Sequence, residues 1–268
     1  MDDAGALLVA RPEGMVCSPG RAMDESTVDF DRIDALLADV WVDPEVFALC
    51  PDYRVMLVAV DGLAPDDDEE HGETMLQAAE ASARGALRDG PPEQLPHLAA
   101  WRGAHRAVGA KPKRYRNSVE ALLRRAESGL PRINRLTDIY NAISVLHQIP
   151  LGGEDLTQLV GPLRLVRATG EEPFDTEVDG DTVIEYPAPG EVVRCDDLGV
   201  TCRRWNWRQG RRTRLHEGST SALFILDALE PISSEALRAA VDDLIHQLRR
   251  LGPSVRVAER LITAELAA

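Results

Sequence analysis

Residues suited to chemistry gather in the segment 134–155, which reads NRLTDIYNAISVLHQIPLGGED. Asp138 and Asn141 are three positions apart, so a helix presents both on one polar stripe that can line a pocket. The adjacent Gly152 and Gly153 let backbone N–H groups come close to a ligand, which suits an oxyanion or a phosphate. The sequence therefore predicts a ligand pocket here, and a plain turn at the glycines is the alternative.

Positive charge is concentrated in two segments of an acidic chain. The net charge is −15, yet residues 101–136 hold ten Lys/Arg against two Glu, and residues 203–214 (RRWNWRQGRRTR) hold no acid. Cations concentrated in this way are suited to local phosphate contact rather than loose adhesion. Nucleic acid is therefore the predicted partner. The residues expected to contact it are Lys111, Lys113, Arg114, Arg116, Arg203, Arg204, Trp205, Trp207 and Arg208.

Two tryptophans lie within the second basic segment. Trp205 and Trp207 alternate with Arg204, Asn206 and Arg208. A strand would place both indoles on one face and the polar side chains on the other. Indole and guanidinium planes can stack on unpaired bases. The alternative is a pair of core tryptophans beside a solvated basic face.

Three segments in this order resemble the tRNA-editing domain of the phenylalanyl-tRNA synthetase beta subunit, in the free-standing form that occurs without the synthetase body. They are WRGAHRAVGAKPKRYRNSVEALLRR, then LPRINRLTDIYNAISVLHQIPLGGEDL, then GVTCRRWNWRQGRRT followed by ALFILDAL. The resemblance extends over roughly residues 47–229, about two thirds of the chain. The ordered set is more specific than any one segment.

The resemblance implies a pocket for the amino acid esterified to the tRNA 3′ end. Within it, Asn141 would hydrogen-bond the substrate and Asp138 would hold the helix in place. The alternative is structural, with Asn134 capping the helix and Asp138 paired with an arginine. The residues expected to bind the substrate are Asn134, Arg135, Tyr140, Asn141, Glu154 and Asn206.

The resemblance also assigns an acidic residue and reveals one departure. Asp227 in ALFILDAL takes the place of a family acid that recognises the phenolic hydroxyl of misattached tyrosine; the alternative is an edge-strand carboxylate facing solvent. The family has Pro-Leu-His where this chain has Pro-Leu-Gly, ending at Gly152. Specificity for a tyrosyl ester is therefore not carried over. The expected catalytic residues are Gly152, Gly153 and Asp227.

The expected mechanism has no covalent intermediate, because the histidines are scattered and no nucleophile motif is readable. Water would attack the ester, assisted by backbone donors at the glycines and by the ribose hydroxyl of the tRNA. We expect a trans-acting aminoacyl-tRNA deacylase that acts on misacylated tRNA. The alternative is a non-catalytic module that binds charged tRNA or an amino-acid-like ligand for a partner or a tRNA-dependent pathway.

The order of elements predicts the fold class. Helical patterns over 71–90, 94–109, 118–129 and 135–148 precede short strands after Pro150, a helix ending at Gly252 and one more strand. This order favours an α+β fold, with N-terminal helices packed on a mixed, mostly antiparallel sheet in a single globular domain. We expect residues 46–268 to form the editing-like domain and residues 1–45 to be an N-terminal extension.

Composition excludes several other classes. No run of about 18 apolar residues is present, and the start MDDAG lacks the basic region of a secretory signal. The four cysteines have no CxxC spacing, so neither a metal nor a cofactor is expected. We expect a cytoplasmic protein that binds the acceptor end of tRNA, with no membrane contact and no DNA.

Overall fold

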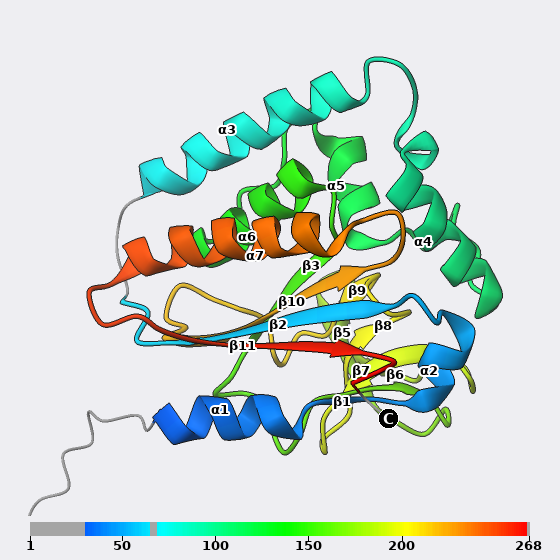
Figure 1. Cartoon of the computed structure of the whole chain (residues 1–268). Helices are drawn as coiled ribbons and strands as arrows, with labels where there is room; N and C mark the ends of the chain where they lie inside the picture. The colour runs from blue at the N-terminus through cyan, green and yellow to red at the C-terminus, as the bar shows by residue number, and fades with distance from the viewer. Residues whose placement is uncertain (1–29, 65–68, 267–268) are drawn as a thin grey trace, which may run out of the picture.

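The computed structural model describes residues 30–64 and 69–266 (Figure 1). Within these residues the helices are α1 (Phe30–Asp39), α2 (Pro44–Leu49), α3 (Glu69–Ala86), α4 (Pro96–Ala107), α5 (Ser118–Arg125), α6 (Arg135–His147) and α7 (Ser234–Leu248), with short 3-10 helices at Pro92–Gln94 and Arg249–Leu251. The strands are β1 (Trp41–Val42), β2 (Arg54–Asp61), β3 (Leu151–Asp155), β4 (Arg164–Arg167), β5 (Phe174–Val178), β6 (Asp181–Glu185), β7 (Val192–Cys195), β8 (Val200–Arg203), β9 (Arg208–Gln209), β10 (Ser221–Ala228) and β11 (Arg256–Thr263).

A central antiparallel sheet with the order β11-β2-β10-β3 separates two hydrophobic cores. In β2, Met56 and Val58 face the helical layer with α3, α6 and α7, whereas Val55 and Leu57 face the layer with α1 and the second sheet (Figure 1). Both faces are buried, which is why the strand reads as an uninterrupted apolar run. The predicted α+β class is confirmed.

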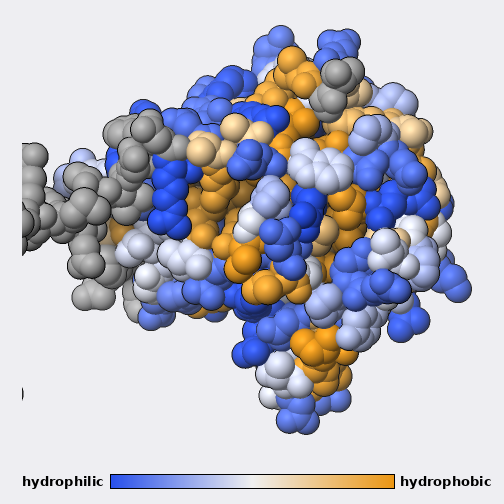
Figure 2. All heavy atoms as spheres, turned by 90° about the horizontal axis from the view of Figure 1, so that it is seen from below, coloured by the Kyte–Doolittle hydropathy of each residue, from blue (hydrophilic) through white to orange (hydrophobic). Residues whose placement is uncertain are grey.

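A second sheet, β1-β4-β7-β8-β9, lies on the side of the central sheet away from α6 and α7. Its β1–β4 pair is parallel and its other pairs are antiparallel, so the mixed, mostly antiparallel prediction is also confirmed. On the α1 side of the molecule, hydrophobic residues form patches between hydrophilic ones (Figure 2). Trp41 is 42% exposed.

Side-chain caps fix where the helices begin. The Asn117 side chain accepts from Glu120 N–H at 2.7 Å, at the start of α5. At the start of α6, Asn134 accepts from Thr137 N–H at 3.0 Å. Such caps satisfy N–H groups that have no partner within the helix. These two caps confirm the predicted helix starts and position α5 and α6 side by side with β3.

Residues 30–45 pack with the rest of the chain. Ile33 and Leu37 of α1 join the core beneath the central sheet, and Val42 of β1 pairs in register with Leu165 of β4. The structure thus joins this part of the expected extension to the domain. Residues 1–29 lie outside the described residues. Across 30–64 and 69–266, no helix combines the length and the apolar character needed to span a membrane.

Candidate functional site

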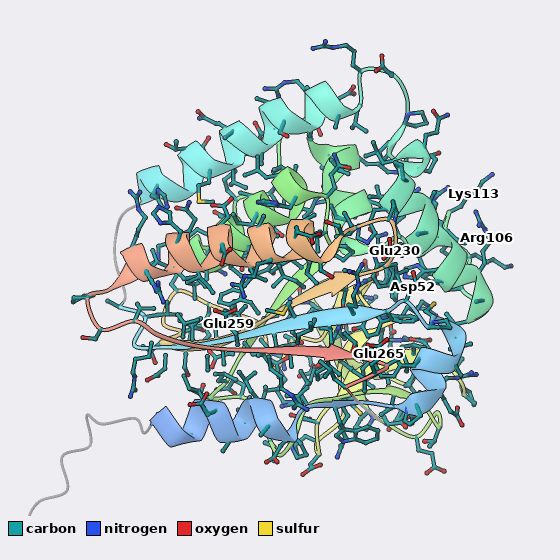
Figure 3. The ribbon with its side chains drawn as sticks, in the orientation of Figure 1. Asp52, Arg106, Lys113, Glu230, Glu259 and Glu265 are labelled. Atoms are coloured by element: carbon teal, nitrogen blue, oxygen red, sulfur yellow. The ribbon has the colours of Figure 1, made fainter. Side chains whose placement is uncertain are left out.

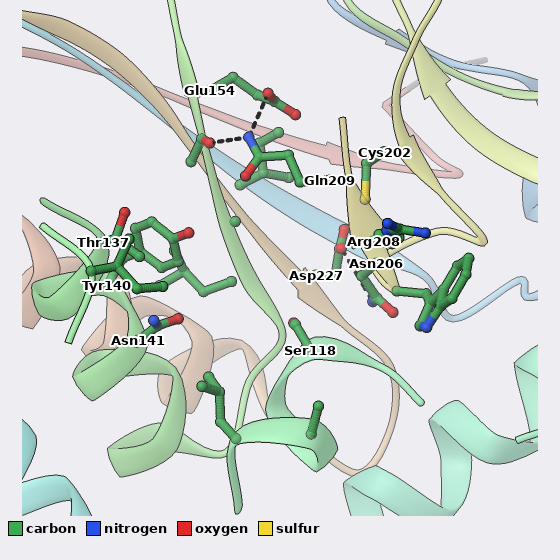
Figure 4. Close-up of a pocket in the computed structure, with 18 of the residues that line it drawn as sticks. Ser118, Thr137, Tyr140, Asn141, Glu154, Cys202, Asn206, Arg208, Gln209 and Asp227 are labelled. Carbon is green, nitrogen blue, oxygen red and sulfur yellow. Dashed lines mark hydrogen bonds between the residues drawn. The ribbon is translucent and has the colours of Figure 1, made fainter. Parts of the chain in front are cut away.

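A cavity of about 280 Å³ opens beside the edge strand β3 (Figure 4). One wall comes from α5 and α6, and the other comes from β8, β9 and the turn between them, with β10 behind. Tyr140 and Asn141 lie on one side of this space, and Asn206 and Asp227 on the other. The polar residues lining it include Ser118, Thr137, Tyr140, Asn141, Glu154, Arg194, Cys202, Asn206, Arg208, Gln209 and Asp227.

The two glycines of β3 have different roles. The Asp227 N–H donates to the Pro150 carbonyl at 3.0 Å. Hydrogen-bonded pairs alternate along an antiparallel ladder, so the backbone groups of Gly152 are used in pairing with β10, whereas those of Gly153 point to the outer edge of β3. The 213–215 segment lies along that edge, where the Asp155 N–H donates to the Thr213 carbonyl at 2.9 Å. The expectation that both glycines supply N–H donors is therefore corrected, because the N–H of Gly152 belongs to the sheet. At the edge, the Gly153 carbonyl accepts from Gln209 at 2.6 Å.

The space around the glycines differs as well. At Gly153, a Cβ would lie 2.6 Å from Leu215 Cδ1 and 3.2 Å from Tyr140 Cε1, so a side chain does not fit. At Gly152, a Cβ would meet no heavy atom within 4 Å. Gly152 lines the cavity and stands where the resembled family has histidine. The missing side chain therefore leaves open space rather than space filled by a neighbour.

Asp227 lies in a buried network at the back of the cavity. It is 1% exposed, so the alternative of a solvent-facing carboxylate is wrong. Its Oδ1 accepts from Tyr53 Oη at 2.6 Å and from Arg194 at 2.5 Å, and its Oδ2 accepts from Asn206 Nδ2 at 3.3 Å. Three protein donors occupy this carboxylate. The carboxylate holds Arg194 and Asn206 and also lines the cavity, so the expected contact with a substrate hydroxyl stays a prediction.

Glu154 is the second carboxyl group among the described residues that line the cavity. It is 3% exposed, and its Oε2 accepts from Gln209 Nε2 at 2.8 Å. Burial raises the pKa of Glu154 to about 7. The cavity thus holds one carboxylate tied to an arginine and one carboxyl group that changes its charge near neutral pH.

The α6 residues divide between the cavity and structural roles. Tyr140 and Asn141 line the cavity as expected. Asn134 caps the helix, which is the structural alternative, and Arg135 donates to the Ala64 carbonyl at 2.5 Å, so neither lines the cavity. Asp138 accepts from the Ile133 N–H at 2.9 Å and so holds the start of the helix. Of the expected substrate-binding residues, the structure brings together Tyr140, Asn141, Glu154 and Asn206.

The strand that would have placed both tryptophans on one face is not continuous. A turn interrupts it, with φ of 46° at Arg204 and 68° at Trp205. Trp205 is fully buried and packs edge-on against Tyr53, with ring centroids 5.2 Å apart. Trp205 is therefore a core residue and cannot stack on a base. Trp207, in contrast, is partly exposed and lines the cavity.

Three of the predicted tRNA-binding arginines, Arg116, Arg203 and Arg204, are engaged in ion pairs, and Arg204 lies 3.3 Å from Glu191. Arg203 is 6% exposed and pairs with Glu191 at 2.8 Å and with Glu185 at 2.7 Å. Its charge is compensated inside the protein, so Arg203 is corrected to a structural role. Arg116 lies 3.8 Å from Glu120 and remains partly exposed.

The 111–116 loop meets the 204–208 turn in a second hollow of about 480 Å³. The Tyr115 and Trp207 rings are 4.8 Å apart, and the Arg204 guanidinium lies 3.6 Å from the Tyr115 ring centroid and 4.7 Å from that of Trp207. Trp207 and Arg208 line both hollows, which therefore adjoin. We call Arg114, Tyr115, Arg204, Trp207 and Arg208 the arginine-aromatic cluster.

The lysines of the same loop project from the surface. Lys111 and Lys113 are exposed, and Lys113 points away from the ribbon (Figure 3). Within residues 30–64 and 69–266, no three His, Cys, Asp or Glu side chains are grouped to hold a metal ion. Cys50, Cys195 and Cys202 are free thiols.

Sequence reasoning missed Arg194 and Tyr115. Arg194 is a buried arginine within the apolar strand VVRC, and an arginine in such a run is a signal that a buried anion lies opposite. Tyr115 stands between Arg114 and Arg116, where an aromatic residue among cations is typical of a stacking surface. Both signals were present in the sequence.

Comparison with known proteins locates the similarity in the cavity region. A family model described as the B3/4 domain matches residues 100–251, which include all the cavity residues named above. Among solved structures, the chain is similar to an N-terminal fragment of the phenylalanyl-tRNA synthetase beta subunit from Pyrococcus horikoshii, with 11% identity and a TM-score of 0.42. The alignment covers 83% of this chain and 53% of that one, so the chain spans about half its length. No curated protein matches the chain.

Proposed function

Because the chain belongs to the B3/4 domain family, we propose that it is a trans-acting aminoacyl-tRNA deacylase that hydrolyses the ester of misacylated tRNA. This family membership confirms that the chain is a relative of the beta-subunit domain. The observation that carries the activity is the junction of two hollows at Trp207 and Arg208. One is a small polar cavity, and the other is a wider hollow lined by arginines, aromatic rings and Glu185, which pairs with Arg203. One suits an amino acid, and the other suits the nucleotides that carry it.

The polar cavity has the size and lining of a small-ligand site. Its volume of about 280 Å³ is near the lower end for such sites. The Asn141 amide faces it from α6, and the Asn206 amide faces it from the opposite wall. These groups can orient an aminoacyl ester by hydrogen bonds while a water molecule attacks. Gly153, which lines the cavity, directs its backbone groups away from β10 and toward the outer edge of β3.

Asn141→Ala is expected to slow ester hydrolysis by about 10- to 100-fold, corresponding to about 1.4–2.7 kcal/mol of transition-state stabilisation. Affinity for tRNA should be unchanged, because the amide contacts the amino acid rather than the phosphates. Single-turnover loss of the aminoacyl group, measured on a panel of charged tRNAs, provides the test. Ser144→Ala is the matched control: Ser144 lies on the same helix but outside the cavity, and its loss removes a hydrogen bond to the Ile149 carbonyl beyond the helix end. This variant should leave the rate unchanged. An equal loss in both variants would contradict the assignment.

The arginine-aromatic cluster supports binding of the acceptor end. Its rings can stack on unpaired bases, and its guanidinium groups can contact phosphates. The exposed Lys111 and Lys113 extend the positive surface from the cluster. In a chain with a net charge of −15, such a local concentration of cations orients the polyanion toward one face.

Replacing Lys111, Lys113 and Arg114 together by alanine is expected to weaken tRNA binding and to flatten its salt dependence. Each phosphate that is no longer neutralised by a cation reduces the slope of log affinity against log salt by about 0.7–0.9. Binding measured by fluorescence anisotropy at several salt concentrations tests this. Replacing the exposed Arg88, Arg249 and Arg250 removes the same charge from positions outside both hollows. If both triple variants bound alike, net charge rather than the loop would govern affinity.

One observation favours a second candidate function. Gly152 stands where the resembled family has histidine, and the space there is open. A cavity with one polar group fewer suits a module that holds charged tRNA without hydrolysing it. Such a module would show the salt-dependent binding described above and no loss of ester.

A further inference from the structure

The two carboxyl groups facing the cavity have opposite environments. Asp227 is compensated by Arg194, Tyr53 and Asn206. Glu154 has no ion-pair partner among the described residues, and the Gln209 amide donates a hydrogen bond to it. A carboxylate bound by a cation is a poor proton acceptor, whereas one buried without a cation is a good one. Two carboxyl groups with such different surroundings are suited to different roles.

The fold directs Glu154 toward the cavity. In β3, Glu154 and Gly152 lie two positions apart and so share one face of the sheet. Their partners Leu223 and Ile225 face the same core, and Ile225 itself lines the cavity. Gln209 Nε2 donates to both the Gly153 carbonyl, at 2.6 Å, and Glu154 Oε2, at 2.8 Å (Figure 4). One amide therefore fixes the carboxyl group relative to the Gly153 backbone in the cavity wall.

We propose that Glu154 is the general base that activates the attacking water. This inference rests on the proposed deacylase function. The ionised carboxylate removes a proton from water as the water oxygen bonds to the ester carbonyl carbon. The tetrahedral intermediate then expels the ribose oxygen, which takes that proton from Glu154. The products are the free amino acid and tRNA with its terminal hydroxyl restored, and Glu154 returns to its carboxylate form.

The charged and titratable groups around Glu154 do not compete with it as the base near pH 7. Arg194 of β7 and Asp227 of β10 neutralise each other as an ion pair at 2.5 Å. Burial raises the pKa of Cys202 in β8 to about 12, and burial also raises the pKa of Tyr140 in α6 to about 12, so both stay protonated near pH 7. With its own pKa raised by burial to about 7, Glu154 ionises as the pH rises through neutrality. Hydrolysis is therefore expected to increase with pH through that range and then level off.

The experiment uses tyrosyl-tRNA, phenylalanyl-tRNA and then the remaining charged tRNAs as probes of the full chain. Single-turnover rates are measured from pH 5.5 to 8.5, and the uncatalysed loss of ester is subtracted at each pH. With any probe that the wild type hydrolyses, Glu154→Gln is expected to lower the rate by about 100- to 1000-fold and to abolish the rise through pH 7. Glu154→Asp, which keeps the base but shortens its reach, should retain the rise at a reduced rate. A tRNA with an amide in place of the ester should bind wild type and Glu154→Gln equally.

The outcomes separate this inference from the proposed function. A wild type that hydrolyses no probe would overturn both. A wild type that hydrolyses a probe, with Glu154→Gln retaining the rate within threefold and the same pH profile, would overturn the role of Glu154 alone. Loss of rate together with loss of amide-analogue binding would assign Glu154 to substrate binding and would also overturn its role as base. Circular dichroism of each variant confirms folding, and if Glu154→Gln unfolds, the pH profile of Glu154→Asp decides.

Discussion

Asp227→Ala is expected to lower the free energy of unfolding by about 3–5 kcal/mol, because it leaves the Arg194 guanidinium buried without its anion. Arg194 is 5% exposed, so solvent cannot replace the missing carboxylate. The change also removes the acceptor of the Tyr53 hydroxyl at 2.6 Å. Urea unfolding followed by circular dichroism measures the difference.

An exposed ion pair provides the control for this prediction. Glu230 has a side chain that is 66% exposed and lies 3.4 Å from Arg54. Glu230→Ala should cost less than about 1 kcal/mol, since solvent screens the pair. If Asp227→Ala cost no more than Glu230→Ala, Arg194 would have access to water or to another anion. The buried network would then not be the support of the cavity wall.

Trp101→Ala is expected to destabilise the chain by about 3–5 kcal/mol by opening a cavity in the core. Trp101 has no exposed surface and packs edge-on against Trp205, with ring centroids 5.5 Å apart. Its indole N–H also donates to His97 Nε2 at 3.0 Å. Thermal unfolding of the variant, with the heat-capacity change fixed from the wild type, gives the free energy.

Trp41→Ala is the matched control for Trp101, because the same side chain is removed from a position that is 42% exposed. Its cost should be well below that of Trp101→Ala, since less apolar surface returns to water. Equal costs would mean that the core beneath the central sheet collapses around the missing indole. Trp101 would then not be the residue that joins α4 to the Trp205 turn.

Local signals predicted most of the elements. The caps at Asn117 and Asn134 depend on one side chain and one nearby N–H, so they can be read from a short stretch of sequence. The uninterrupted apolar run at 55–60 indicates a buried strand for the same local reason. The boundary placed at residue 45 had no local signal, because α1 is held by β11 and β2, which come later in the chain.

The sequence predicted the cavity residues that lie on one helix. It did not predict the contacts between residues on strands that are far apart in the chain. Asn141 follows from its spacing on α6, and the structure places it in the cavity. The pairing of Arg194 with Asp227 joins two strands of different sheets, and no spacing within the sequence predicts it. The positions of the two tryptophans depend on the positive φ of Arg204 and Trp205. This turn buries the Trp205 indole in the core and leaves the Trp207 indole at the cavity. Non-glycine residues adopt that conformation too rarely for the pattern to predict it.

In the proposed function, this cavity hydrolyses an aminoacyl ester. The most direct measurement is loss of ester from a panel of correctly and incorrectly charged tRNAs, with purified wild type in excess over tRNA and above the dissociation constant measured for each. We predict that at least one misacylated tRNA loses its amino acid faster than in buffer alone, and that Asn141→Ala slows this loss. If every charged tRNA in the panel binds and stays intact, the deacylase function is contradicted and the non-catalytic module is the function that remains.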